Sequence, residues 1–507
     1  MAWPFATISM LGLQPGQPAS WLQVLAMALL AWQLHGAHSW RRGAWLGGLF
    51  ATVMQCATSW WLFISLHVYG GLPAPLTVIA IVLLTALLGL YYAAATGLFV
   101  AFAPARPAPR AIVFAALWLL AELARVKFFT GFPWGEGGYA HVDGWARPLA
   151  AWIGVHGLTF LAAGVAAWLA FALAAPKTRW LAAAAVGAAG IALAWLPVSH
   201  ADDVETDPAL GRPLSVTLLQ GNIPQDEKFQ GGTGIATALR WYGEQLLGAT
   251  TALVVAPETA LPLLPPQLPE GYWQALRNRF ATGGQAALIG LPLGSGGIGY
   301  SNSVVGLKPA GPDQPVSDGW SGVYRYDKHH LVPFGEVIPT GFQWFIDLMR
   351  IPLGDFNRGA VGQPSFDWRG QRLAPNICYE DLFGEELGAR FIDPARAPTV
   401  FVNVSNIAWF GNTVAIDQHL QISRMRALEF SRPMIRATNT GATVIIDHAG
   451  RVTHSLPRHT RGALLGDVLG RSAITPYAWW TARFGLWPLW ALGLGVPALA
   501  LMLRRRR

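Results

Sequence analysis

The stretch LAPNICYEDLF, residues 373–383, indicates the fold of the polar half of this chain. It begins with an apolar run of strand length, and Cys378 follows that run directly. Two other strand-like runs end in the same way, since LVVAP precedes Glu258 and VYRYD precedes Lys328. Strand ends are where an α/β layer presents side chains to a pocket. The pattern therefore predicts a layered α/β domain with Glu258, Lys328 and Cys378 as candidate site residues.

Outward from these runs, residues 198–483 alternate strand-like with helix-like segments, which predicts one mixed α/β domain. The expected strands are short apolar runs bounded by turn residues: Ser215–Leu219, Ala252–Ala256, Ala287–Leu291, Ser303–Leu307, Val323–Tyr326, Leu373–Ile377, Thr399–Val404, Thr443–Ile446 and Ala463–Gly466. Helical periodicity is expected over four segments: Ile235–Leu247, Gly271–Thr282, Asp381–Phe391 and Ala415–Phe430.

The rest of the chain consists of apolar runs that approach or reach the roughly 20 residues needed to span a bilayer: Trp21–His35, Trp45–Leu66, Leu76–Phe102, Ala111–Phe128, Ala151–Ala175, Trp180–Leu196 and Phe484–Leu503. The composition agrees, because 53% of the residues are hydrophobic and only 13% are charged. We therefore expect transmembrane helices in residues 1–197, a catalytic domain in 198–483, and a last transmembrane helix with a basic cytoplasmic tail in 484–507.

The apolar residues 1–13 are too short to span a bilayer alone. They are either a truncated or half-inserted first helix, or the true start of the protein lies upstream. A cleaved signal peptide is disfavoured, because the segment has no basic region at its start.

Basic residues predict the orientation in the membrane. Ten of them, with no acidic residue, lie in four short segments: Arg41 and Arg42, Arg106 and Arg110, Lys177 and Arg179, and Arg504 to Arg507. The positive-inside rule places these segments in the cytoplasm and residues 198–483 on the opposite side. Removing these ten charges from the net +8 leaves −2, so the basic balance needs no nucleic-acid partner.

The chain contains two cysteines, and they belong to different environments. Cys56 lies in an apolar run and Cys378 in the polar half, so a disulfide between them is implausible. A lone cysteine after a strand is more often a small core residue than a nucleophile. A reduced thiol in an exported domain is nevertheless hard to explain as core filling. Glu258 could accept its proton and Lys328 could stabilise an oxyanion, which leaves a nucleophilic Cys378 as the competing interpretation.

Seven motifs, in order along the chain, resemble the bacterial apolipoprotein N-acyltransferase family of the nitrilase superfamily: TGFPW (130–134), QGNIPQDEKF (220–229), APETALP (256–262), KHHLVPFGEVIP (328–339), ICYEDLF (377–383), SNIAWFG (405–411) and RMRALEFSRPMIRATNTG (424–441). The resemblance implies a multi-pass helical membrane domain and an extracytoplasmic αββα sandwich. It assigns Glu258 as catalytic base, Lys328 as catalytic lysine and Cys378 as nucleophile. Glu336, Tyr379 and Glu380 match supporting active-site residues.

The resemblance also implies the reaction. An acyl group passes from a phospholipid through a thioester on Cys378 to the α-amino group of a diacylated apolipoprotein, without cofactor or metal. The enzyme is expected in the bacterial inner membrane with its catalytic domain in the periplasm. Two alternatives remain: a membrane-anchored nitrilase-type amidase, and a non-catalytic scaffold, against which the intact Glu258, Lys328 and Cys378 argue.

Two positions depart from the family pattern: Phe229, where tryptophan is common, and Ile407, where aspartate is usual. Because Phe229 retains an aromatic ring, we expect little effect from the first departure. The second, Ile407, could change the local loop geometry or the fit of the substrate. His329 and His330 lack the spacing of a metal site. Gly294 to Gly299 lacks the lysine that ends a phosphate-binding loop.

Two further features have competing interpretations. Glu122, Arg125 and Lys127 lie near the outer end of an apolar helix, where they are either a functional site or a structural ion pair at the interface. Residues 342–353, FQWFIDLMRIPL, are either a lid that dips into lipid or an ordinary amphipathic core helix.

Overall fold

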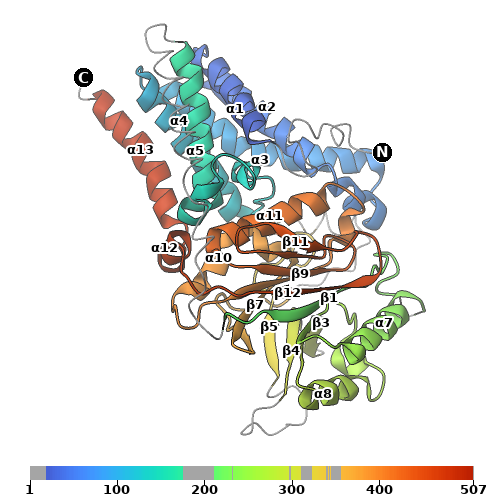
Figure 1. Cartoon of the computed structure of the whole chain (residues 1–507). Coiled ribbons are helices and arrows are strands. Elements are labelled where there is room, and N and C mark those ends of the chain that lie inside the picture. Colours follow the sequence, from blue (N-terminus) through green and yellow to red (C-terminus); the bar gives the residue numbers. More distant parts are fainter. Residues whose placement is uncertain are drawn as a thin grey trace.

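The computed structural model describes residues 19–174, 210–230, 232–295, 299–309, 323–338, 341, 343 and 356–505. The chain has two parts, a bundle of helices and a sandwich of two β-sheets. The bundle lies above the sandwich in Figure 1. The bundle is formed by helices within residues 19–174 and by the C-terminal helix, as the hydropathy pattern predicts. The sandwich begins at β1 (Leu214–Gln220) and lies in the sequence between these helical segments.

The helices of the bundle are α1 (Ser20–His35), α2 (Trp40–Ser59), α3 (Ala74–Phe102), α4 (Pro107–Lys127), α5 (Ala150–Leu173) and α13 (Trp487–Arg505). Within the expected run Trp45–Leu66, helix α2 ends at Ser59. A π-helical turn over Ile64–Tyr69 follows it. Helices α2 and α3 pack closely, because a Cβ atom at Gly47 would overlap the Thr96 side chain. Small residues permit such close approach between membrane helices.

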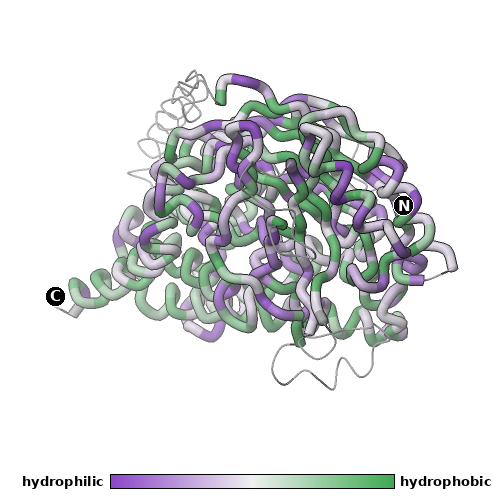
Figure 2. Tube along the Cα trace, turned by 90° about the horizontal axis from the view of Figure 1, so that it is seen from below, coloured by the Kyte–Doolittle hydropathy of each residue, from purple (hydrophilic) through white to green (hydrophobic). Residues whose placement is uncertain are grey.

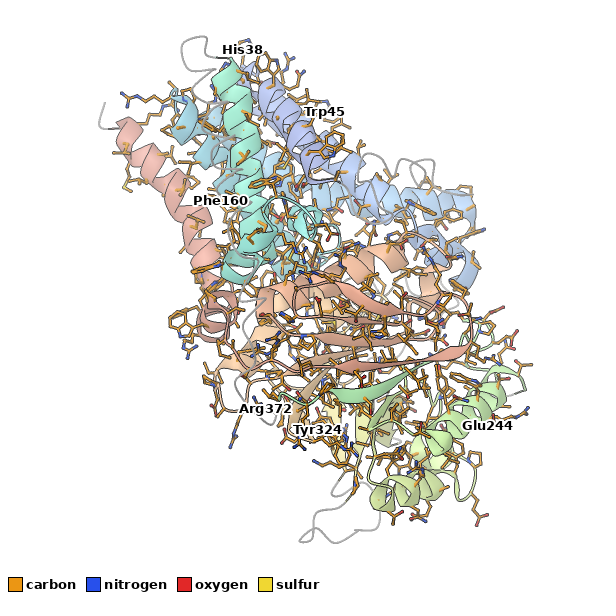
Figure 3. All side chains as sticks on the ribbon, viewed as in Figure 1. His38, Trp45, Phe160, Glu244, Tyr324 and Arg372 are labelled. Atoms are coloured by element: carbon orange, nitrogen blue, oxygen red, sulfur yellow. The ribbon has the colours of Figure 1, made fainter. Side chains whose placement is uncertain are left out.

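Three of the described helical segments are long and apolar enough to cross a membrane: Ala74–Phe102, Arg147–Leu173 and Trp487–Arg504. Figure 2 shows α13 as a mostly hydrophobic tube that projects beside the C-terminal label. Large apolar side chains are exposed on the bundle, such as Trp45 at 70%, which Figure 3 labels on α2. The expected helix Trp180–Leu196, the segment 1–13 and the basic loop Lys177–Arg179 lie outside the described residues.

Each sheet of the sandwich has six strands. The first sheet has the order β12-β1-β2-β3-β4-β5 and the second has the order β11-β10-β9-β8-β7-β6. The strands of the first sheet are β1 (Leu214–Gln220), β2 (Leu253–Val255), β3 (Ala286–Ser295), β4 (Gly299–Leu307), β5 (Tyr324–Asp327) and β12 (Gly462–Val468). Those of the second are β6 (Phe366–Trp368), β7 (Gln371–Ile377), β8 (Val400–Ser405), β9 (Met434–Thr438), β10 (Val444–Ile446) and β11 (Val452–Ser455).

Helices cover both outer faces of the sandwich, which confirms the predicted αββα arrangement. Buried Val, Leu and Ile side chains of both sheets form the core between them. Helices α7 (Gly234–Gly248) and α8 (Tyr272–Thr282) lie on the side of the first sheet, and α10 (Gly384–Gly388), α11 (Ala415–Phe430) and α12 (Pro476–Phe484) lie on the side of the second. Helix α11 therefore separates the second sheet from the helical bundle (Figure 1).

Some sequence-based boundaries were wrong. The expected helix Asp381–Phe391 is instead a 3₁₀ turn over Cys378–Leu382, the short α10 and a second 3₁₀ turn over Ala389–Phe391. Glycines at both ends of α10 explain this interruption, because glycine disfavours helix interiors. The pattern also missed β6, β9 and β11. The domain limits at 197 and 483 stay predictions.

Candidate active site

Glu258, Lys328 and Cys378 converge from the ends of three strands. Glu258 follows β2 and Lys328 follows β5 in the first sheet, whereas Cys378 follows β7 in the second. The Lys328 Nζ atom lies 3.2 Å from Glu258 Oε1. The charges of both side chains act on the Cys378 thiol. The structure thus brings together three residues that lie far apart in the sequence.

The Glu258 carboxylate is buried and fully hydrogen-bonded. Its Oε1 atom accepts hydrogen bonds from Lys328 Nζ at 3.2 Å and from Asn302 Nδ2 at 2.7 Å. Its Oε2 atom accepts from the Asn406 backbone N–H at 2.7 Å. Burial alone would raise the pKa of Glu258, but Lys328, Lys228 and these hydrogen bonds hold the pKa below its ordinary value. The carboxylate is therefore ionised at neutral pH.

Lys328 is held between two carboxylates. Besides Glu258, its Nζ atom lies 2.8 Å from Glu336 Oε2. Glu336 also accepts hydrogen bonds from Asn302 Nδ2 at 2.8 Å and from the Val332 backbone N–H at 2.9 Å. Burial would lower the pKa of Lys328, but the two carboxylates raise it above the ordinary lysine value. The side chain is therefore a fixed ammonium.

Cys378 has an unusual backbone conformation, with φ at +52°. Such a left-handed conformation costs on the order of 1–3 kcal/mol in a residue other than glycine. The Cys378 carbonyl is held by His419 Nε2 at 3.2 Å and by Asn403 Nδ2 at 3.4 Å. Burial and the Glu258 charge raise the pKa of the Cys378 thiol to about 12, against the opposing effect of Lys328. The resting thiol is therefore protonated and needs a base.

Glu380 connects the cysteine loop to the lysine loop. Its Oε2 atom accepts hydrogen bonds from the Ile377 backbone N–H at 2.6 Å and from the Tyr326 hydroxyl at 2.8 Å. Its Oε1 atom accepts from the backbone N–H groups of His329 at 2.6 Å and His330 at 3.2 Å. The buried Glu380 carboxylate thus fixes the backbone on both sides of the site.

Tyr379 and His330 link the site to the helical bundle. The Tyr379 hydroxyl donates to the Gly131 carbonyl at 3.0 Å, and His330 Nε2 lies 2.8 Å from the Thr130 carbonyl. Both acceptors belong to the TGFPW motif after α4. The second ring nitrogen of His330 lies 2.9 Å from Glu386. Both nitrogens of this histidine thus have partners within the protein.

Lys228 and Asn302 are two site residues that the sequence did not reveal. Lys228 is buried, and its Nζ atom donates to the Glu258 carbonyl at 3.1 Å and to Thr259 Oγ1 at 2.8 Å. Burial lowers the pKa of Lys228 to about 8, although the charges of Glu258 and Cys378 oppose this shift. Lys228 lies in the quoted QGNIPQDEKF motif, but nothing in that motif indicates that its ammonium is buried.

The two departures from the family pattern have different surroundings. Ile407 is buried in an apolar cluster with Trp61 and Trp134 of the bundle, so this position accommodates an aliphatic side chain. Phe229 is 50% exposed. Of the other sequence features, residues 344–353 of the possible lid and Gly296 to Ile298 of the glycine-rich turn lie outside the described residues.

Two family models match consecutive parts of the chain. Residues 6–168 match the model of the apolipoprotein N-acyltransferase N-terminal domain, and residues 216–473 match the carbon-nitrogen hydrolase model. An amidase from Nesterenkonia sp. AN1 is 16% identical, with 57% of this chain and 99% of that chain covered at a TM-score of 0.38.

Curated relatives match nearly the whole chain. A protein of Verminephrobacter eiseniae named apolipoprotein N-acyltransferase is 58% identical, and the match covers 96% of this chain and 90% of the relative. A protein of the same name from Ralstonia nicotianae is 45% identical with the same coverage. The family model of the N-terminal part and both relatives carry the same name. The chain belongs to the apolipoprotein N-acyltransferase family, with a nitrilase-type α/β domain attached to a helical domain.

Proposed function

We propose that this chain N-acylates apolipoproteins through a thioester on Cys378, with Glu258 as the base and Lys328 as the oxyanion-stabilising group. The observation that carries this proposal is the meeting of a buried carboxylate, a buried ammonium and a protonated thiol. The acyl donor is a membrane phospholipid. The acceptor is the α-amino group of an N-terminal diacylglyceryl-cysteine.

In the first half-reaction, Glu258 accepts the thiol proton while the Cys378 sulfur attacks the ester carbonyl carbon of the phospholipid. The carbonyl oxygen gains negative charge, which the Lys328 ammonium stabilises. The intermediate collapses, the carbon–oxygen ester bond breaks, and Glu258 returns the proton to the departing lysophospholipid alkoxide. A thioester on Cys378 remains.

In the second half-reaction, the neutral α-amino nitrogen of the apolipoprotein attacks the thioester carbonyl. Glu258 accepts the proton that this nitrogen releases, and Lys328 again stabilises the oxyanion. The carbon–sulfur bond breaks, and Glu258 protonates the departing thiolate. The products are an amide-linked, triacylated lipoprotein and the regenerated Cys378 thiol.

We further propose a multi-pass arrangement in the bacterial inner membrane, with the catalytic domain on the periplasmic side. Three apolar helices of spanning length and the alternation of basic segments support this arrangement. Both substrates are anchored in the membrane, so a tethered active site would meet them without their leaving the lipid.

Mass spectrometry of the full-length protein in phospholipid micelles tests the scheme. The expected result is a fatty-acyl adduct on Cys378 that disappears when a diacylated lipopeptide is added and becomes acylated. Cys378→Ala should form no adduct, whereas Cys56→Ala, which removes the second cysteine, should behave as the parent. Acylation of the lipopeptide by Cys378→Ala would refute the thioester. Loss of the adduct to water without peptide acylation would indicate the amidase alternative.

A further inference from the structure

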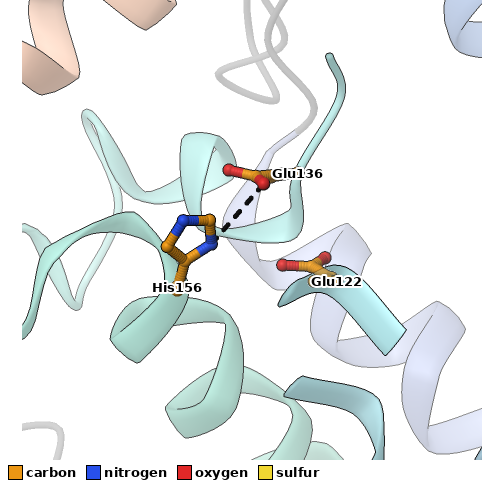
Figure 4. Close-up of side chains that lie close together, drawn as sticks. All are labelled: Glu122, Glu136 and His156. Atoms are coloured by element: carbon orange, nitrogen blue, oxygen red, sulfur yellow. Dashed lines mark ion pairs between the residues drawn. The ribbon is translucent and has the colours of Figure 1, made fainter. Parts of the chain in front are cut away.

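A second cluster of ionisable side chains lies where the helical bundle meets the catalytic domain. It consists of Glu122 of α4, Glu136 of the connecting loop and His156 of α5 (Figure 4). One oxygen of each carboxylate and one imidazole nitrogen all lie within 4.8 Å of one another. The reaction proposed above uses none of these three residues.

These side chains are buried without hydrogen-bond partners for the atoms that face the cluster. Glu122 is 1% exposed, and Glu136 and His156 are each 3% exposed. Within the described part of the chain, four atoms of the cluster have no hydrogen-bond partner: both oxygens of Glu136, Oε2 of Glu122 and Nδ1 of His156. Buried polar atoms without partners are rare in native proteins, and buried carboxylates are paired or coordinate metals. These atoms therefore require a ligand or a proton.

The spacing suits a metal ion. His156 Nδ1 lies 3.5 Å from Glu136 Oε1, which is longer than a good hydrogen bond. Two ligands on one tetrahedral zinc ion, each bonded at about 2.0–2.1 Å, are separated by about 3.4 Å. Glu122 is oriented by the Gly137 backbone N–H, which donates to its Oε1 atom at 3.1 Å and leaves Oε2 free.

The charges of two buried arginines, Arg125 and Arg426, act on the cluster, but neither forms an ion pair with it among the described residues. Arg125 Nη1 donates to the Trp134 carbonyl at 3.0 Å. Among the ion pairs of the described residues, none joins Arg125 to Glu122 or to Glu136, so the ion pair considered from the sequence is not formed. Two carboxylates this close in a buried site need a shared proton or a cation.

A cavity of about 250 Å³ adjoins the two carboxylates, and His156 lies outside its lining. Glu122 and Glu136 line it together with residues of α1, α2 and α11. Imidazole and carboxylate together suit divalent zinc and its first-row neighbours better than magnesium or calcium, which prefer oxygen ligands alone. We propose that Glu122, Glu136 and His156 bind one zinc-like divalent cation, which links α4, α5 and the loop between them.

The consequence is structural and does not depend on the proposed acyl-transfer mechanism. The loop that carries Glu136 also carries Trp134, whose Nε1 atom donates to Gln418 of α11 at 2.7 Å. The same loop offers the Gly131 carbonyl to Tyr379, the neighbour of the nucleophile. A bound cation therefore holds the surface on which the catalytic domain rests.

Cobalt titration of the tag-free, chelator-treated, full-length protein in detergent tests the site. We expect one equivalent of Co²⁺ to bind with visible d–d absorption, and Zn²⁺ to displace it. Glu136→Gln and His156→Gln should bind at least tenfold more weakly. His141→Gln is the matched control, because His141 is buried in the same loop, bonds Gln23 and lies outside the cluster. It should bind as the parent does.

X-ray absorption of the zinc-loaded parent gives a measurement that needs no variant. The expected shell contains one imidazole with oxygen ligands and no sulfur. Absence of saturable binding, equal binding by Glu136→Gln and the parent, or a shell with sulfur or several imidazoles would each overturn the proposal. If the parent binds no metal and Glu136→Gln raises its melting temperature, a shared proton occupies the site instead.

Discussion

Replacement of Glu336 by glutamine tests whether Lys328 must be held between two carboxylates. Both Glu336 oxygens have donors as neighbours. Oε1 accepts from Asn302 Nδ2 at 2.8 Å and from Lys328 Nζ at 2.9 Å. Oε2 accepts from the Val332 N–H at 2.9 Å and lies 2.8 Å from Lys328 Nζ. A glutamine retains one oxygen, so its NH₂ group must face a donor on one side. Glu336→Gln therefore removes a charge and turns one attraction into a clash.

The size of the effect follows from these contacts. A hydrogen bond to a charged group contributes about 1.5–3 kcal/mol. Since about 1.4 kcal/mol corresponds to a factor of ten, loss of one such bond at the lysine should slow acylation of Cys378 by roughly 10- to 150-fold. The global fold should survive, because the Glu336 side chain is 12% exposed and lies at the edge of the site.

The measurement is single-turnover formation of the Cys378 acyl adduct, followed by mass spectrometry at fixed times. Glu386→Gln is the matched control, because this carboxylate pairs with His330 at 2.9 Å and does not contact Lys328. It should react at nearly the parent rate. A Glu336→Gln rate within threefold of the parent, with the melting temperature preserved, would refute the role assigned to Glu336.

Three further predictions concern Glu258, Tyr379 and Gln418. Because the folded pKa of Glu258 is lowered, its contribution to stability is present above the unfolded value of about 4.3 and is lost as pH falls through the folded pKa. The same protonation removes the proposed base, so the acylation rate should fall only below about pH 4.3. A loss of rate that begins near pH 7 would contradict this. Tyr379→Phe removes the bond to Gly131 and should lower the free energy of unfolding by about 0.5–1.5 kcal/mol in denaturant titrations, whereas no change would show that the contact is not formed. Gln418→Leu leaves the indole N–H groups of Trp61 and Trp134 without their acceptor and should cost roughly 2–5 kcal/mol by the same measurement, with Gln418→Glu as the partial rescue.

Much of the fold followed from apolar patterning, and the exceptions have physical causes. Strand β9 was missed because Arg436 interrupts its apolar run. The structure buries this charge, with Arg436 Nη2 2.7 Å from His419 Nδ1. Strand β11 was missed because all four of its residues are exposed and none adds to an apolar run. Patterns of hydrophobicity cannot show a strand whose side chains bury no apolar surface.

The candidate site was predictable for a different reason. Glu258, Lys328 and Cys378 each follow a strand, and strand ends meet at one edge of a layered domain. Lys228 and Asn302 were not predictable, because their roles depend on contacts with Glu258 that no spacing along the chain reveals. The sequence singled out Glu122 but not its neighbours Glu136 and His156, because their proximity depends on how the helices pack.

The contacts between the two parts of the chain give the helical bundle a role beyond anchoring. Tyr379 and His330, on opposite sides of the Glu380 carboxylate, both bond carbonyls of the TGFPW loop. That loop in turn holds Gln418 of α11 through Trp134, and α11 supplies His419 to the Cys378 carbonyl. The backbone of Cys378, which has a strained φ, is therefore supported from the bundle side as well as from its own sheet. A site built in this way depends on the helices for its geometry, which is a physical reason for the helical and α/β parts to occur in one chain.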